Sequence, residues 1–234
     1  MASGPGIAGA EGGGGTPVWI PAPPGTKRAQ EYAAAGDWPG YFSVMDGKPA
    51  RETLLAALAG FEREGVAPGL SLDLGCGEGR DTIELLRRGW RVVAVDSTPE
   101  AFGYLERKVS GDERSRLAPC VSALEAFEFP PARSVDLVNA SFTLPFVNPG
   151  EFGRVWRGIA TSLRAGGRFA GQFFGERDDW ARAPGRSHHS RAEVEALLAD
   201  FQLEMLDEVE KQEAPELGGA KHWHVFHVMA RRRH

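Results

Sequence analysis

The chain has 234 residues, which is long enough for one sizeable α/β domain and short for two. An apolar content of 42% and a charged content of 25% are ordinary for a globular protein in water. A net charge of −5 argues against a general nucleic-acid or membrane-surface binder, because such proteins need a basic patch. The one short basic run, residues 231–233, is expected to be a solvated tail.

Cysteine usage and the first residues set further expectations. Cys76 and Cys120 are too few for a disulfide framework and lack zinc-type spacing, so we expect a reducing, cytoplasmic setting and no metal. No apolar stretch approaches the roughly 20 residues of a membrane span. Residues 1–25 are rich in glycine, show no signal-peptide pattern and are expected to form a disordered tail. Residues 26–234 are expected to form a single domain, with 26–65 as an N-terminal lid and helix.

The segment after the tail is broken by glycine and proline but rich in rings. Residues 31–47 hold Tyr32, Trp38, Tyr41 and Phe42. These side chains either attach a lid to the core or line a pocket. The segment that follows, 48–65, has its leucines and phenylalanine on one helical face and ends at a glycine, so we expect a helix there.

From residue 70 onward, apolar runs and helical patterns alternate. Strands are expected at 70–74, 91–95, 118–122, 135–139 and 168–174, and helices at 81–88, 100–109, 152–163 and 190–201. Two further strand-like runs, 204–210 and 222–230, are expected to close the chain as a hairpin. The alternation predicts a doubly wound, Rossmann-like α/β fold with a parallel sheet, helices on both faces and one antiparallel strand.

The turn after the first strand reads GCGEG and carries Gly75, Gly77 and Gly79. In a doubly wound sheet the ligand binds at this turn, beyond the carboxyl ends of the strands. The spacing is G-x-G-x-G, whereas a dinucleotide fold has G-x-G-x-x-G. Asp73, two residues before the first glycine, would repel a pyrophosphate and attract a cation. The pattern therefore favours S-adenosylmethionine (SAM), which carries a sulfonium and an ammonium group, over a nicotinamide dinucleotide.

Asp96 ends the second strand about twenty residues after Gly75, where such folds place an acid that accepts hydrogen bonds from ribose. Structural alternatives stay open for both acids. Asp96 could merely cap the helix that begins near Pro99, and Asp73 could pair with an arginine. Cys76 lies inside the turn, where only a small side chain fits, so we expect it to pack rather than to act as a nucleophile.

The segment LDLGCGEGRDTIELLRRGWRVVAVDSTPEA, residues 72–101, resembles motifs I and II of the class I SAM-dependent methyltransferases. SLRAGGRFAGQFFG, residues 162–175, resembles the glycine turn and fifth strand of the same fold. Within the class, residues 75–90, 139–146 and 221–232 are most similar to a bacterial branch near the tellurite-resistance methyltransferases. The resemblance implies a seven-stranded sheet of order 3-2-1-4-5-7-6, SAM as cofactor and S-adenosylhomocysteine as product.

Matching positions assign cofactor roles by resemblance. Around the turn with Gly79, the methionine end of SAM should be held by Asp73, Gly75, Cys76 and Gly77. Asp96 should bind the ribose, with Ser97 beside the adenine. Ala123, Leu124 and Glu125 should flank the adenine ring. Many relatives have an aspartate just after the third strand, where this chain reads VSALEAF, and Glu125 is the expected substitute.

Candidates for the acceptor side come from three segments. Asn139 opens the loop NASFTLPFVNP, stands at a position expected to touch the cofactor, and is a catalytic candidate; the loop departs from the N-P-P-[YF] motif, so amine methylation is not predicted. His222 and His224 share one face of the last strand, with His227 on the other, and are either structural or part of the acceptor pocket. The 176–190 loop, with Trp180, is either a substrate lid or a solvated surface loop.

We therefore expect a SAM-dependent methyltransferase acting on a small molecule, as a monomer or homodimer, without nucleic-acid or membrane partners. Because the cofactor carries the activated methyl group, no fixed catalytic constellation is required. The resemblance favours a soft nucleophile, such as a thiol or a selenium or tellurium species. Alternatives are an O- or N-methyltransferase of a secondary metabolite, an enzyme that uses SAM for cyclisation, and a SAM-binding partner or sensor protein without catalysis.

Overall fold

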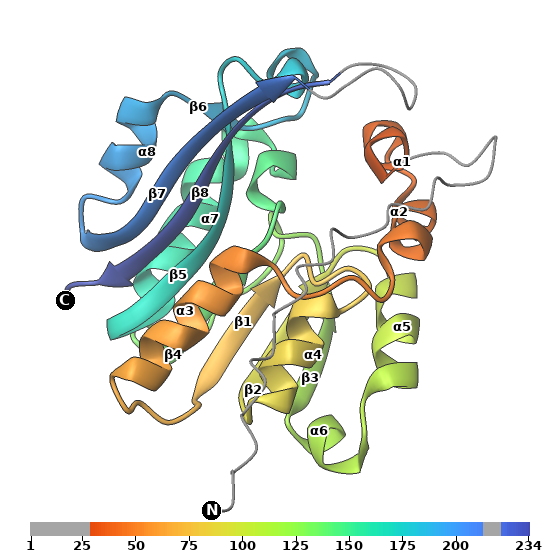
Figure 1. Ribbon diagram of the computed structural model, residues 1–234, viewed down its shortest axis with the longest axis vertical. Coiled ribbons are helices and arrows are strands. Elements are labelled where there is room, and N and C mark those ends of the chain that lie inside the picture. The colour runs from red at the N-terminus through yellow and green to blue at the C-terminus, as the bar shows by residue number, and fades with distance from the viewer. Residues whose placement is uncertain (1–28, 213–220) are drawn as a thin grey trace, which may run out of the picture.

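The computed structural model describes residues 29–212 and 221–234 (Figure 1). The expected disordered tail, residues 1–25, lies outside the described residues, as does most of the turn between the last two strands. Within the described ranges the chain forms one twisted sheet with helices on both faces. The strand order is β3-β2-β1-β4-β5-β8-β7.

The five long parallel strands of the sheet are β1 (Leu70–Leu74), β2 (Arg91–Asp96), β3 (Leu117–Val121), β4 (Val135–Ala140) and β5 (Leu163–Gly175). The central strands are covered on both faces, so β1 and β4 are buried along almost their whole length. Leu72 pairs with Val93 on one side, and Asp73 with Asn139 on the other. The carboxyl ends of β1, β2 and β4 therefore meet at one edge.

The end of the chain completes the sheet in the opposite direction. β8 (His222–Arg232) runs antiparallel to β5 and to β7 (Phe201–Gln212). Because β7 and β8 are the sixth and seventh long strands, the expected order 3-2-1-4-5-7-6 is confirmed. β6 (His188–His189) is a two-residue strand that pairs with β5 outside this order. As an antiparallel strand, β8 begins at the edge where the parallel strands end.

Two hydrophobic cores lie on opposite faces of the sheet. One face is covered by α3 (Glu52–Arg63), α4 (Arg80–Arg87) and α5 (Glu100–Lys108), whose buried leucines and phenylalanines form one core. The other is covered by α7 (Pro149–Ser162) and α8 (Arg191–Leu197), with Trp156 at its centre. The sequence predicted these helices, with small shifts at their ends: α7 begins three residues earlier than expected, at Pro149, which is favoured in a first helical turn.

Short elements were not predicted. α1 (Ala29–Ala35) and α2 (Trp38–Met45) occupy the segment read as an irregular connector, and Figure 1 shows them near the carboxyl ends of the parallel strands. Asp37 caps α2 by accepting the N–H of Gly40 at 3.0 Å, and Pro39 sits in the first turn, so these residues start a helix rather than break one. The other short elements are α6 (Gly111–Ser115), η1 (Leu144–Phe146) and η2 (Asp179–Arg182).

Candidate active site

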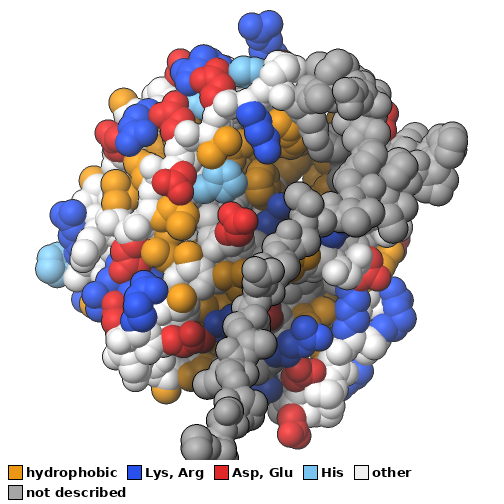
Figure 2. Space-filling view, in the orientation of Figure 1, with side chains coloured by type: hydrophobic (Ala, Val, Ile, Leu, Met, Phe, Trp, Pro, Cys, Tyr) orange, Lys and Arg blue, Asp and Glu red, His pale blue; other side chains and the backbone are white. Residues whose placement is uncertain are grey.

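A cavity of about 760 Å³ opens at the carboxyl ends of the parallel strands (Figure 2). One half of its wall comes from the β1–α4 turn and the segments after β2 and β3. The other half comes from α2, the segment after β4, and the cavity-facing residues of β5, β7 and β8. Figure 2 shows hydrophobic side chains gathered inside the hollow, with charged groups around its rim. The two halves differ in chemistry, and we describe them in turn.

The glycine turn forms the floor of the first half. Gly75 and Gly77 line the cavity and have φ of 69° and 52°, a region that non-glycine residues avoid. A Cβ atom at Gly75 would collide with the Thr143 side chain. The N–H of Gly75 donates to the Val95 carbonyl at 2.7 Å, which holds the turn against β2. The absence of side chains keeps the backbone open to a ligand.

Asp96 lines the cavity at the end of β2. Its carboxylate accepts the N–H of Gly77 at 2.9 Å and the N–H of Thr98 at 2.8 Å. Burial raises the pKa of this carboxyl. The Asp96 side chain thus joins the glycine turn to the segment that follows β2, and it stands where the sequence places a ribose-binding acid. Ser97 lines the cavity beside it, as expected for an adenine neighbour.

Two charged residues of the turn were missed by the sequence reading. Glu78 and Arg80 both line the cavity. Among the described residues, Glu78 Oε1 and Arg80 Nε and Nη1 are buried without a hydrogen-bond partner. Burial raises the pKa of Glu78 and lowers that of Arg80. One carboxylate oxygen and two guanidinium nitrogens without partners at one end of a cavity fit a zwitterion, with the acid toward an ammonium and the arginine toward a carboxylate.

Asp73 and Asn139 lie behind the cavity wall rather than on it. Asp73 is 1% exposed and accepts hydrogen bonds from Thr82 Oγ1 at 2.5 Å and from Asn139 Nδ2 at 2.8 Å. Asn139 Nδ2 also donates to Asp81 at 3.0 Å, so one amide bridges two carboxylates. Burial, with the nearby Asp81 charge, raises the pKa of Asp73 to about 7. Their role here is to tie β1, β4 and α4 together beneath the glycine turn.

Cys76 and Gly79 are also set back from the cavity. Cys76 is 5% exposed, packs in the core beside α4, and burial raises the pKa of its thiol, which fits packing rather than nucleophilic chemistry. Gly79, with φ of 86°, starts α4 at a point where a Cβ would collide with Leu105. Both residues shape the turn without facing its ligand side.

The segment after β3 supplies the far end of the first half. Ser122, Ala123, Leu124 and Glu125 all line the cavity. Glu125 accepts the N–H of Asn148 at 2.9 Å, which links this segment to the start of α7. Although this segment lacks the aspartate found in many relatives, Glu125 provides a carboxylate near the expected adenine position.

Aromatic rings dominate the second half. Ring centroids of Trp38 and Phe146 are 4.9 Å apart, those of Phe146 and Trp180 are 6.0 Å apart, and those of Trp180 and Trp223 are 5.7 Å apart. All four residues line the cavity. The rings of the α2 segment therefore line a pocket, which was one of the two expectations for them. The guanidinium of Arg186 sits 4.4 Å from the Phe146 ring centre, and no ion pair to it is found in the described part of the chain.

The positions of the histidines agree with the structural one of the two expectations for His222 and His224. His222 and His224 are not part of the cavity lining, whereas His227 is. His224 is 1% exposed and contacts Glu208 at 2.9 Å, and His222 contacts Glu210 at 2.9 Å. The expected division of faces holds, but the cavity opens on the face of β8 that carries Trp223, Val225 and His227.

The 176–190 loop contributes two of its residues, Trp180 and Arg186, to the cavity. It is held to the start of β8 by a buried ion pair, in which Lys221 Nζ lies 2.6 Å from Asp178 Oδ1. The N–H of His224 donates to the other Asp178 oxygen at 3.0 Å. Arg177 points the other way and pairs with Glu208 and Glu210 on β7. The loop is therefore partly cavity wall and partly surface.

Residues 72–167 match the family model described as a methyltransferase domain. The match spans β1 to the first residues of β5, so the sheet around the glycine turn is that of a methyltransferase domain. No curated protein matches the chain in sequence. Within the described residues, no helix has the length and apolar character needed to span a membrane, and no cluster of three or more His, Cys, Asp or Glu side chains is placed to hold a metal.

Solved structures share the fold of this methyltransferase domain. TehB from Haemophilus influenzae is 16% identical, with a TM-score of 0.65 over 82% of this chain and 66% of that one, just under two thirds of its length. A 1,6-didemethyltoxoflavin N1-methyltransferase from Burkholderia thailandensis is 25% identical, with a TM-score of 0.57 over 92% of this chain and 94% of that one. The N-methyltransferase NodS from Bradyrhizobium japonicum is 18% identical, with a TM-score of 0.60 over 81% of this chain and 91% of that one.

Both of these N-methyltransferase structures contain S-adenosylhomocysteine, the demethylated form of SAM. The first half of the cavity fits SAM in three respects. The glycine turn leaves room for the methionine chain of SAM. The unpartnered Glu78 and Arg80 atoms match the ammonium and carboxylate groups of that chain. The Asp96 carboxylate faces the cavity where it could accept hydrogen bonds from ribose hydroxyls. When bound, SAM supplies a methyl group on a positively charged sulfur, which is already activated for transfer.

Proposed function

We propose that the protein transfers the methyl group of SAM to a ring nitrogen or oxygen of a small planar molecule. The observation that carries this proposal is the ring-lined second half of the cavity, built from Trp38, Phe146, Trp180 and Trp223. Aromatic side chains at these spacings offer flat apolar faces to a flat ligand. Arg186, stacked on Phe146 at the same wall, adds a cation for an anionic or electron-rich edge.

The sequence resemblance favours a soft nucleophile such as tellurite or selenite. Such an acceptor and a planar organic molecule require different groups in the cavity wall. Tellurite and selenite are small, strongly hydrated oxyanions that need several hydrogen-bond donors when they leave water. The second half of the cavity is rich in rings instead, and its size exceeds the need of such an ion. The wall therefore supports a planar organic acceptor over an inorganic one.

One structural neighbour acts on a molecule of this kind. The Burkholderia thailandensis protein, 25% identical over nearly the whole of both chains, is described as the N1-methyltransferase of 1,6-didemethyltoxoflavin and was solved with that molecule bound. Its acceptor is a ring nitrogen of a planar heterocycle. This likeness supports the proposed class of acceptor without naming the acceptor of this chain.

We also propose that residues 26–65 act as a lid over the acceptor. Within this segment α2 supplies Trp38, Tyr41 and Phe42, and the Trp38 ring packs on Phe146 from the segment after β4. Closing an apolar cover over the acceptor excludes water and fixes orientation, which together account for much of the rate gain in methyl transfer.

The test follows radioactive label from methyl-labelled SAM into separate acceptors. One set holds planar molecules, namely 1,6-didemethyltoxoflavin, lumazine and catechol, and the other holds tellurite, selenite and an alkyl thiol with headspace trapping. We expect label in the planar set. Trp180→Leu should raise the KM for a planar acceptor about fivefold, the scale of one aromatic contact, and Trp180→Phe should restore it. Label only in the second set, or no transfer by protein that binds SAM, would contradict the proposal.

A further inference from the structure

His227 faces the acceptor half of the cavity from the middle of β8. Its neighbours across the sheet are Gln172 on β5 and Asp207 on β7. The imidazole is half-buried, and no hydrogen bond to it is found among the described residues, in contrast to the acid-paired His222 and His224. A ligand in the cavity therefore meets an imidazole whose nitrogens are not committed to the protein.

The residue that faces His227 across the cavity floor is strained. Phe142, one residue after Ser141 at the end of β4, has φ of 55°, which is unusual for a bulky side chain. Its N–H donates to Gln172 Oε1 at 2.8 Å, and its ring centre lies 6.0 Å from that of His227. The next residue, Thr143, abuts Gly75 of the glycine turn. His227 and Phe142 thus stand where the acceptor half borders the cofactor half.

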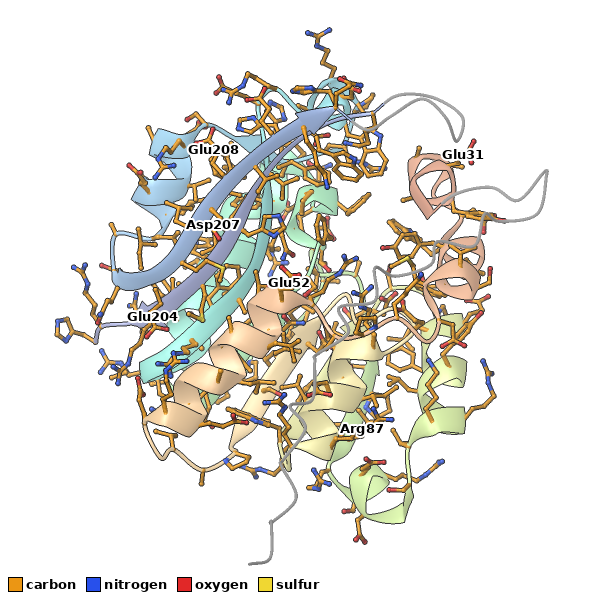
Figure 3. The ribbon with its side chains drawn as sticks, viewed as in Figure 1. Glu31, Glu52, Arg87, Glu204, Asp207 and Glu208 are labelled. Atoms are coloured by element: carbon orange, nitrogen blue, oxygen red, sulfur yellow. The ribbon has the colours of Figure 1, made fainter. Side chains whose placement is uncertain are left out.

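Charged groups around His227 come from two elements. Arg51 and Glu52 stand at the start of α3, and Asp207 and Lys211 lie on β7 (Figure 3 labels Glu52 and Asp207). Burial lowers the pKa of His227 below its ordinary value of 6.5; the two acids raise it, and Arg51 and Lys211 lower it. The imidazole is therefore neutral at pH 7, and the two nearby carboxylates can stabilise its protonated form.

We propose that His227 is the proton acceptor of the reaction and that the methyl acceptor is a planar heteroaromatic molecule with an acidic ring N–H or O–H. This inference rests on the proposed function. The lone pair of the ring atom forms the bond to the methyl carbon, the carbon–sulfur bond breaks with its electrons left on sulfur, and the ring proton moves to an imidazole nitrogen. The imidazolium then releases this proton to water beside exposed Asp207 and Glu52.

The probe is lumazine, a flat bicyclic heterocycle whose acidic ring N–H ionises with a shift of absorption to longer wavelength. It is titrated into the S-adenosylhomocysteine complex at a pH where free lumazine is neutral. Wild type is expected to bind part of it as the anion with the proton on His227, because the attraction between imidazolium and anion offsets the lowered pKa of His227. His227→Gln is expected to bind it as the neutral molecule, because the amide can hydrogen-bond but cannot accept the proton.

The second readout is methyl transfer from SAM to lumazine. His227→Gln should lower the rate at least tenfold near pH 6.5, and the deficit should shrink at alkaline pH, where lumazine is already ionised in solution. The wild-type rate should fall as the pH drops through the lowered pKa of His227. His188→Gln, a surface histidine on β6, is the matched control and should behave as wild type in both readouts.

Two results overturn the inference. If His227→Gln binds lumazine as the anion and keeps the wild-type rate and pH profile, His227 does not take the proton. If wild type neither binds nor methylates lumazine, the proposed acceptor class is wrong, and the proposed function falls with it. Unchanged S-adenosylhomocysteine affinity shows that a variant is folded. If His227→Gln does not fold, His227→Asn is used in its place.

Discussion

At the scale of single residues, Asp96 is the proposed ribose contact whose surroundings are best defined. Its carboxylate already accepts two backbone N–H groups and still faces the cavity. Asp96→Ala should weaken S-adenosylhomocysteine binding by at least ~1 kcal/mol, the scale of a lost charged hydrogen bond. Calorimetry with the 2′-deoxy analogue separates ribose binding from a general distortion, because the variant should lose less with that ligand. Equal losses with both ligands, or no loss at all, would contradict the ribose assignment.

The histidines show how far residue patterns reach. Alternation along a strand correctly separates His222 and His224 from His227, because side chains of a strand point to opposite faces in turn. It does not say which face meets the cavity, since that depends on how β5, β7 and β8 pack beside α2 and η1. The same limit applies to Asp73, whose spacing from the glycines marks the turn but not the direction of its carboxylate, which is fixed by Thr82 and Asn139.

At the scale of elements, the Lys221–Asp178 ion pair positions the loop that carries Trp180 and Arg186. The two side chains are 8% and 0% exposed, so removing one partner leaves the other buried without its counter-charge. Lys221→Met should destabilise the structure by about 3 kcal/mol, weaken lumazine binding and leave S-adenosylhomocysteine binding intact. Thermal unfolding and two titrations measure these effects.

The control for this prediction is an ion pair on the surface. Arg191→Met breaks its contacts with Glu195 and Glu208 and, because the arginine is half exposed, should cost less than about 1 kcal/mol. A Lys221→Met variant that is no less stable than Arg191→Met, and that binds lumazine as wild type does, would show that the ion pair does not hold the acceptor wall.

Helices and strands with a strong period were predictable, and short elements less so. α8 was found from its capping box at Ser190 and Glu193. The same signature, Ser110 with Glu113, marks α6 and was overlooked because α6 has only five residues and buries none of them. β5 starts at Leu163, five residues before the expected point, because Leu163 already pairs with Val135 of β4. The register shifts before the next pair, Leu137 with Arg168, so the glycine-rich residues 164–167 form an irregular stretch of the strand.

At the scale of the whole molecule, the buried Asp73 makes stability depend on pH in an unusual direction. Its pKa is about 7 in the folded protein and near 3.8 in the unfolded chain. Between these values the folded state keeps a proton that the unfolded state has lost, so this group contributes stability that declines as the pH rises from 4 to 7. His189, whose burial lowers its pKa to about 4, contributes the opposite trend between pH 4 and 6.5.

A variant isolates the contribution of Asp73. Denaturant unfolding at several pH values gives the free energy of unfolding of wild type and of Asp73→Asn. The wild-type value minus the variant value should fall by at least about 1 kcal/mol between pH 4 and pH 7 and then level off. A difference that is constant across this range would mean that Asp73 ionises normally in the folded protein.

Alternating patterns along the chain predicted the sheet, and one contiguous stretch predicted the cofactor, but no pattern predicted the acceptor site. Gly75, Gly77 and Asp96 lie within 22 residues, and together with the charge of Asp73 they favour SAM over a dinucleotide. The acceptor wall joins Trp38, Phe146, Trp180 and Trp223, which come from four segments far apart in the chain. No local pattern reports that these rings meet, because their meeting depends on the packing of all four segments.

The most direct test of the account is a competition in a single reaction. Methyl-labelled SAM is mixed with the protein, lumazine and tellurite in equal amounts, and label is measured in solution and in trapped headspace gas together with the S-adenosylhomocysteine formed. We predict that the label appears on lumazine in solution, with one S-adenosylhomocysteine formed for each methyl group transferred. Label in the headspace, as a volatile methylated tellurium species, would contradict it.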